Sequence, residues 1–124
     1  MKDIICKEIS YFIIGKCMEV HKTLGAGFLE IVYKDALEYE LSSANILYER
    51  EKKYEVQYKN ITLPHKFYAD FIVDDSIILE MKSSNGITTE YMAQTFNYLK
   101  VSKKRLALIV NFGENSLKYK RIVN

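Results

Sequence analysis

Asp70, Glu80 and Lys82 are three polar residues in an otherwise largely apolar stretch of the chain. Two carboxylates on neighbouring strands supply the hard oxygen ligands that Mg2+ or Mn2+ prefers, and such an ion keeps waters and accepts phosphate oxygens. The bound ion can activate a water for attack on phosphorus. The ammonium of Lys82, about 6 to 7 Å from Glu80 along a strand, can position that water or stabilise charge on the phosphate. The residue types therefore predict metal-dependent hydrolysis of phosphodiesters.

The surrounding residues predict two strands joined by a turn. Residues 68–73 and 76–81 are rich in β-branched and aromatic side chains and are separated by two aspartates, which are common turn residues. Because side chains alternate along a strand, Glu80 and Lys82 share one face of the second strand. Asp70 lies opposite Glu80 only if the turn has an odd number of residues.

A Glu-x-Lys sequence on a surface strand often has no role beyond solubility. Here, however, Glu80 follows the apolar residues 77–79, which predict a strand that is buried on both faces. An unpaired carboxylate in such a strand is unfavourable. Glu80 therefore needs a partner, and a metal ion is one.

At these residues the sequence resembles the PD-(D/E)xK nuclease superfamily, with Asp70 as the first acid and Glu80-Met81-Lys82 as the E-x-K element. Ala69 stands where that motif commonly has proline. The resemblance implies that Asp70, Glu80 and the carbonyl of Met81 hold Mg2+ or Mn2+ and that Lys82 is catalytic.

The stretch 27–33, GFLEIVY, is similar to the GxxExxY family, which is grouped with the same superfamily. Glu30 of this stretch matches the family's glutamate, and the resemblance implies that it reaches the metal. Glu30 would also lie in the first turn of a helix, where a carboxylate is favoured for purely structural reasons. Both interpretations remain open. Tyr33 is expected to be a packing residue with a polar tip.

Two further residues are candidates for the edge of the site. Gln94 and Tyr98 are four residues apart and face together on a helix. They resemble the Q-x-x-x-Y motif of exonuclease-like branches, which implies that Gln94 supports catalysis. His21 could lie near the same edge, but a single histidine at a helix end more often makes a structural hydrogen bond.

Hydrophobic periodicity and turn residues predict the remaining elements. Pro64 is expected to interrupt a strand, as proline does at an edge or bulge. The order of elements indicates an α/β protein, and the resemblance implies a restriction-endonuclease-like α-β-β-β-α-β core, with a mixed central sheet flanked by helices and an extra N-terminal helix. The expected elements are helices over 3–23 and 28–43, strands over 46–58, 61–63, 68–73 and 76–81, a helix capped by Thr88 or Thr89, and strands over 106–112 and 116–123.

Composition limits the class of protein. The 124 residues are 48% hydrophobic, and the chain contains one proline and five glycines, which predicts one folded domain over 1–124. No apolar run is long enough to span a membrane, and the start lacks a signal-peptide pattern, so we expect a cytoplasmic protein without membrane contact. Cys6 and Cys17 are about 16 Å apart along one expected helix, so they are expected to be reduced core thiols.

Positive charge is concentrated near the C-terminus. The last 25 residues hold seven basic residues and one acidic residue, against eleven basic and fifteen acidic residues in 1–99. Such clusters bind phosphate groups, although a charged run often only aids solubility. We expect nucleic acid, with DNA favoured over RNA, as the partner, and a homodimer would help so short a chain to grip a duplex. The expected nucleic-acid-binding residues are Lys100, Lys103, Lys104 and Arg105.

Three functions are compatible with these patterns. The first is a Mg2+- or Mn2+-dependent nuclease. The second is a nucleic-acid-binding module that keeps the fold but has weak or no catalytic activity. The third is a protein-interaction module in which the ten tyrosines mark a surface for another protein.

Overall fold

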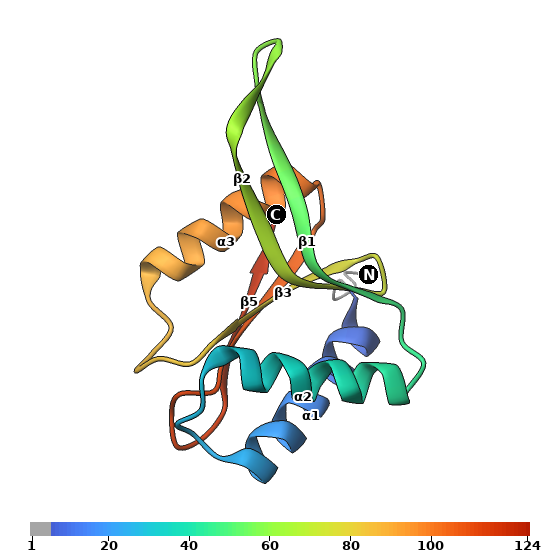
Figure 1. Ribbon diagram of the computed structural model, residues 1–124, viewed down its shortest axis with the longest axis vertical. Coiled ribbons are helices and arrows are strands. Elements are labelled where there is room, and N and C mark those ends of the chain that lie inside the picture. Colours follow the sequence, from blue (N-terminus) through green and yellow to red (C-terminus); the bar gives the residue numbers. More distant parts are fainter. Residues whose placement is uncertain (1–5) are drawn as a thin grey trace, which may run out of the picture.

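The computed structural model describes residues 6–124 (Figure 1). The start of the first expected helix, residues 3–5, lies outside the described part of the chain. Thr88 caps the third helix as expected, because its side chain accepts a hydrogen bond from the Tyr91 amide. The elements are α1 (Lys7–Leu24), α2 (Glu30–Ser43), β1 (Tyr48–Tyr58), β2 (Ile61–Val73), β3 (Ile77–Lys82), α3 (Thr89–Ser102), β4 (Leu106–Asn111) and β5 (Lys118–Val123).

The five strands form one mixed sheet in the order β1-β2-β3-β4-β5. Strands β3 and β4 are parallel and are connected through α3, whereas the other neighbours are antiparallel. The run from α2 to β4 is an α-β-β-β-α-β core, with α1 before it and the edge strand β5 after it. The restriction-endonuclease-like fold class is therefore confirmed.

Helices cover both faces of the sheet (Figure 1). The larger hydrophobic core contains Leu79 and Met81 of β3 together with residues of α1 and α2, and the smaller core contains Ile78 and residues of α3. All six residues of β4 are buried, as are all residues of β3 before Lys82. Burial on both faces explains why the buried residues of these two strands are apolar except for Glu80 and Asn111.

The first two strands form a long hairpin that projects beyond the helices (Figure 1). The expected strands 61–63 and 68–73 are a single strand, β2, from Ile61 to Val73, and Pro64 interrupts only its pairing with β1, at a bulge as expected. The register shifts so that Glu55 pairs with Lys66 while Gln57 pairs with Thr62. Three residues, 63–65, therefore lie opposite one, and this bulge accommodates a proline that cannot donate a ladder hydrogen bond. We call residues 52–68 of this hairpin the β1–β2 arm.

Two side chains fix the loops beside the helices. The hydroxyl of Tyr33 donates to the Gly25 carbonyl and accepts from the Phe28 amide, 3.2 Å away, while its ring stacks on Phe112. Tyr33 is therefore the packing residue with a polar tip that was expected. His21 Nε2 lies 2.9 Å from the carbonyl oxygen of Glu114, which is the structural hydrogen bond favoured for it.

Candidate active site

The turn between β2 and β3 sets the relation of the two acids. Residues 74–76 form a three-residue turn, and Val73 pairs with Ile77 across it. Asp74 and Asp75 both adopt the left-handed conformation, with φ of 56° and 52°, which aspartate tolerates better than most residues. This odd-numbered turn gives the register that brings Asp70 opposite Glu80.

The two carboxylates occupy the place where β2 and β3 separate. The paired residues end at Phe71 and Leu79. Beyond them, the Asp70 amide donates to Oε2 of Glu80 at 3.0 Å, and the Met81 amide donates to Oδ2 of Asp70 at 2.7 Å. Each acid thus hydrogen-bonds the backbone of the other strand, which holds both carboxylates in the gap between the strands.

The environment of Glu80 disfavours its charged form. Glu80 is only 5% exposed, and burial followed by the negative charge of Asp70 raises its pKa to about 8. The hydrogen bond from the Asp70 amide and the charges of Lys82 and Lys34 oppose this rise only in part. At neutral pH the Glu80 carboxyl is therefore protonated, and a bound cation would displace this proton.

Lys34 is a site residue that sequence reasoning missed. It extends from α2, and its Nζ lies 3.0 Å from Oδ1 of Asp70 while also pairing with Glu51. Burial lowers the pKa of Lys34, but the hydrogen bonds to Glu51 and Asp70 outweigh burial, so the net pKa is raised. The available signal was its position four residues after Glu30, on the same helix face.

Lys82 extends toward α3, the helix that carries Tyr91 and Tyr98. The Nζ of Lys82 is 4.6 Å from the centre of the Tyr91 ring. The pKa of Tyr98 is raised by burial and then by the charges of Glu80 and Asp70, which places Tyr98 near the acids. Gln94, one turn earlier on α3, is exposed.

Glu30 connects the start of α2 to the end of β3. The Ser83 amide donates to Oε2 of Glu30 at 3.3 Å, and the Ser83 hydroxyl donates to the Phe28 carbonyl at 2.8 Å. Ser83 directly follows Lys82, so these contacts bring Glu30 to the neighbourhood of the E-x-K element. The carboxylate of Glu30 is exposed and is held from the side by a backbone amide.

The basic residues expected to bind nucleic acid lie at the other end of β3. Lys104 Nζ donates to the carbonyl and to Oδ1 of Asp75, at 2.8 and 3.1 Å, in the turn that precedes β3. Lys100 lies over the Phe96 ring, and Lys103 is the C-cap of α3. The structure therefore does not bring the cluster from Lys100 to Arg105 together with the acids.

The donor set suits a small divalent cation. Asp70 and Glu80 supply carboxylate oxygens at one point, and within residues 6–124 no group of three His, Cys, Asp or Glu side chains forms a larger metal-ligating cluster. Mg2+ typically binds one or two carboxylates and completes its shell with waters and substrate phosphate. Two acids beside a strand carbonyl therefore fit such an ion.

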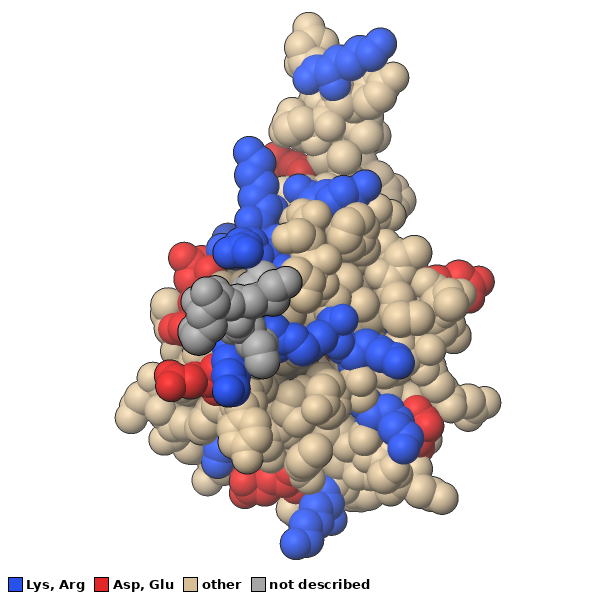
Figure 2. Space-filling view, turned by 180° about the vertical axis from the view of Figure 1, so that it is seen from behind, with Lys and Arg blue, Asp and Glu red and all other residues tan. Residues whose placement is uncertain are grey.

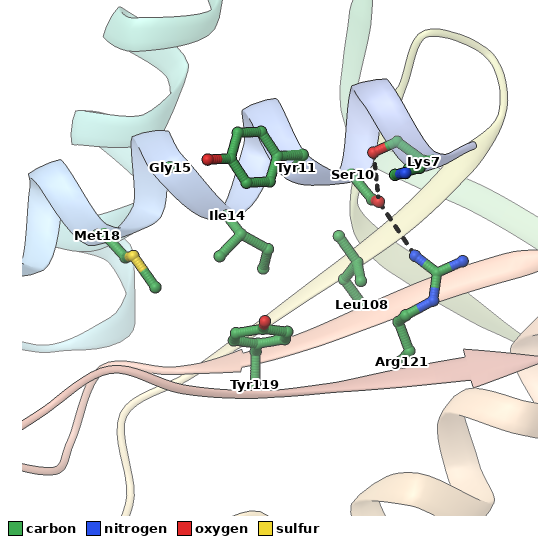
Figure 3. Close-up of a pocket in the computed structure, with 9 residues that line it drawn as sticks. All are labelled: Lys7, Ser10, Tyr11, Ile14, Gly15, Met18, Leu108, Tyr119 and Arg121. Atoms are coloured by element: carbon green, nitrogen blue, oxygen red, sulfur yellow. Dashed lines mark hydrogen bonds between the residues drawn. The ribbon is translucent and has the colours of Figure 1, made fainter. Parts of the chain in front are cut away.

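A separate cavity of about 410 Å3 lies between α1 and the sheet (Figure 3). Tyr11 and Tyr119 lie on its two sides, with Ile14 and Leu108 between them, and Arg121 donates to the hydroxyl of Ser10 at one end. None of the residues that line this cavity is one of the acids or lysines of the site. The cavity is therefore not part of the candidate active site.

Comparison with known proteins agrees with this geometry. The family model of the PD-(D/E)XK nuclease superfamily matches residues 7–122, and the chain belongs to this superfamily. A solved structure, titled "Crystal structure of SSO0001", superposes with a TM-score of 0.56 at 17% sequence identity, over 94% of this chain and 78% of that one. At this identity the similarity shows a shared fold. None of the curated proteins compared matches the chain. Among the described residues, no helix has the length and apolar character needed to cross a membrane.

Proposed function

We propose that this protein is a Mg2+- or Mn2+-dependent nuclease that hydrolyses phosphodiester bonds in DNA. The observation that carries the proposal is the pair of carboxylates, Asp70 and Glu80, held in one gap between β2 and β3. Lys82 follows on the same strand and lies close enough to Glu80 for its charge to lower the pKa of that acid. Membership of the nuclease superfamily supports this assignment.

Each residue of the site has a distinct proposed role. Asp70, Glu80 and the carbonyl of Met81 hold the cation, which when bound supplies Lewis-acid activation of water and phosphate. Lys82 stabilises charge on the phosphate or orients the attacking water. Glu30 supports the site from α2 by its contact with the segment after Lys82. Gln94, on the face of α3 that carries Tyr98, contacts the substrate.

Calorimetric titration of Mn2+ into the wild type and Glu80→Gln tests the proposal. We expect the wild type to bind Mn2+ with an affinity that rises about tenfold per pH unit between pH 6 and 8, because the cation must displace the proton of a carboxyl whose pKa is about 8. Glu80→Gln should bind weakly, without this pH dependence. Equal and negligible heats in both proteins would remove the metal site and most of the case for a nuclease.

Lys34 should compete with the cation for Asp70. Its ammonium already hydrogen-bonds Oδ1 of Asp70, so Lys34→Met should free this oxygen and remove a nearby positive charge. We expect Mn2+ affinity to rise roughly tenfold, which corresponds to about one pKa unit of interaction energy. Lys16→Met is the matched control, because Lys16 also pairs with two carboxylates, Glu19 on its own helix α1 and Glu40 on α2. Unchanged or weaker Mn2+ binding by Lys34→Met would contradict this role.

We assign the chain within the superfamily to the GxxExxY family. Gly27 has a φ of 110°, which favours glycine, and is the first residue of the pattern. Glu30 contacts the Ser83 amide, and Tyr33 fastens the loop between α1 and α2. Gly27 and Tyr33 thus shape the loop before α2, and Glu30 contacts the segment that follows β3.

We further propose a homodimer, in which each copy cuts one strand of a duplex. The side chains of Tyr11, Met18 and Tyr119 are exposed around the cavity between α1 and β5, and such apolar patches mark protein interfaces. Light scattering should give twice the 14.5 kDa mass of one chain, and Tyr119→Lys should shift the protein toward the monomer. A wild-type monomer at high concentration would contradict the dimer.

A further inference from the structure

The β1–β2 arm extends the sheet away from the helices without a core of its own. None of residues 55–66 is buried. The last aromatic contacts that tie the hairpin to the body are at its base, where Tyr54 stacks on Phe67 and Phe67 stacks on Tyr98 of α3, with ring centroids 5.2 and 4.0 Å apart. A two-stranded ribbon alone is only marginally stable in water. Binding of a partner would therefore stabilise the arm.

One face of the arm leads directly to the acid site. Tyr54 and Phe67 face α3, so their neighbours Lys53 and Tyr68, which pair across the strands, lie on the opposite face. Lys66 and Tyr68 share this face, and Asp70, two residues further along β2, contacts Lys34 of α2 on the same side of the sheet. The basic and aromatic face of the arm is therefore continuous with the first acid of the site.

The arm carries positive charge and exposed apolar groups. Residues 52–68 contain four lysines and one acidic residue, a net charge of +3, although the whole chain carries only +2. Lysine and arginine side chains are visible at the end of the arm and along it (Figure 2). At the tip, Tyr58 and Ile61 pair across the strands and are 55% and 53% exposed. Lysines together with exposed apolar side chains complement a polyanion that has apolar groups in its grooves.

We propose that the arm binds the major groove of the duplex DNA substrate, roughly one helical turn from the cleaved bond. Asp70 is ten positions after Asn60, so the tip lies roughly 30 Å from the acids along β2. One turn of duplex spans about 34 to 36 Å, and the major groove of B-form DNA admits a two-stranded ribbon. The deep, narrow major groove of A-form RNA does not. This inference rests on the proposed nuclease function and names its substrate class.

The test compares duplexes that do and do not reach the tip. Binding of the wild type and of Lys53→Ala/Lys59→Ala to a 24-base-pair DNA duplex, an 8-base-pair DNA duplex and a 24-base-pair RNA duplex is measured by fluorescence anisotropy in EDTA. The charge-matched control is Lys16→Ala/Lys22→Ala on α1. All four lysines lack buried side chains, and circular dichroism verifies folding.

We expect the arm variant to lose about tenfold in affinity for the long DNA duplex, with a salt slope smaller by about 2. The loss on the 8-base-pair duplex, and the loss caused by the control, should be less than twofold, and the wild type should bind the RNA duplex more weakly. Equal losses by the arm and control variants, equal losses on long and short duplexes, or no binding of the long duplex by the wild type would overturn the arm's role.

Mn2+-dependent cleavage of the long duplex by the wild type is measured in parallel. Cleavage without an arm effect on binding would remove this inference but leave the nuclease proposal. Arm-dependent binding without cleavage would retain the DNA-binding arm but remove the nuclease proposal.

Discussion

Lys82→Ala is expected to lower the rate of Mn2+-dependent DNA cleavage by about 10² to 10³-fold, the usual effect of removing one group that stabilises transition-state charge. The ammonium lies beside the Tyr91 ring, on the face of β3 that carries Glu80. It is not an oxygen ligand, so Mn2+ binding should remain. A gel assay of an end-labelled duplex measures the rate, and calorimetry measures the retained cation affinity.

The matched control is Lys16→Ala, which removes an α1 lysine paired with Glu19 and Glu40. Its cleavage rate should stay within about twofold of the wild type, because a surface ion pair contributes little. Wild-type cleavage by Lys82→Ala would exclude the catalytic role of this lysine. If the wild type itself binds DNA without cleaving it, the second function, a binding module with weak or no catalysis, becomes the better description.

Gly113→Ala should destabilise the fold by roughly 3 kcal/mol or more, at the upper end of overpacking effects. A Cβ at this position would lie 2.3 Å from the Ser84 amide nitrogen and carbonyl oxygen and 2.8 Å from the Ser83 carbonyl carbon. These are backbone atoms, so no rotamer change relieves the contact. Urea unfolding measures the loss, and cleavage should fall with it because Ser83 follows Lys82.

Gly86→Ala is the control for this substitution. Gly86 closely follows Ser83 and Ser84 in the chain, but no atom lies within 4 Å of a Cβ at this position. Its midpoint of unfolding should match that of the wild type. A Gly113→Ala protein of wild-type stability would show that the loops after β3 and β4 are not closely packed.

The tight packing at Gly113 reflects a polar junction around Asn111. This fully buried side chain accepts hydrogen bonds from the Ser84 and Gly113 amides and donates to the Ser84 carbonyl and to Glu114. It joins the segment after Lys82 to the loop after β4. Asn111 was expected only to be a residue of an apolar strand, because its partner Ser84 is 27 residues away in the chain and no local pattern indicates that contact.

The sequence by itself determined the features that depend on local periodicity and turn chemistry. Two continuous apolar runs predicted the buried strands β3 and β4, and the aspartates at 74 and 75 predicted the turn between β2 and β3. The sequence left the register of Asp70 and Glu80 open, because it required an odd number of turn residues, and the three-residue turn of the structure decided it. Local hydrogen bonding and side-chain alternation are sufficient for these conclusions.

Only the tertiary structure decided how distant elements complete the site. The ion pair of Lys34 with Asp70, the contact of Glu30 with Ser83 and the distance of Lys104 from the acids all depend on how helices pack on the sheet. The continuation of β2 past Pro64 likewise depends on pairing between two strands rather than on the proline alone. Packing brings together residues that are far apart in the chain, and their spacing in the sequence does not predict their distances in space.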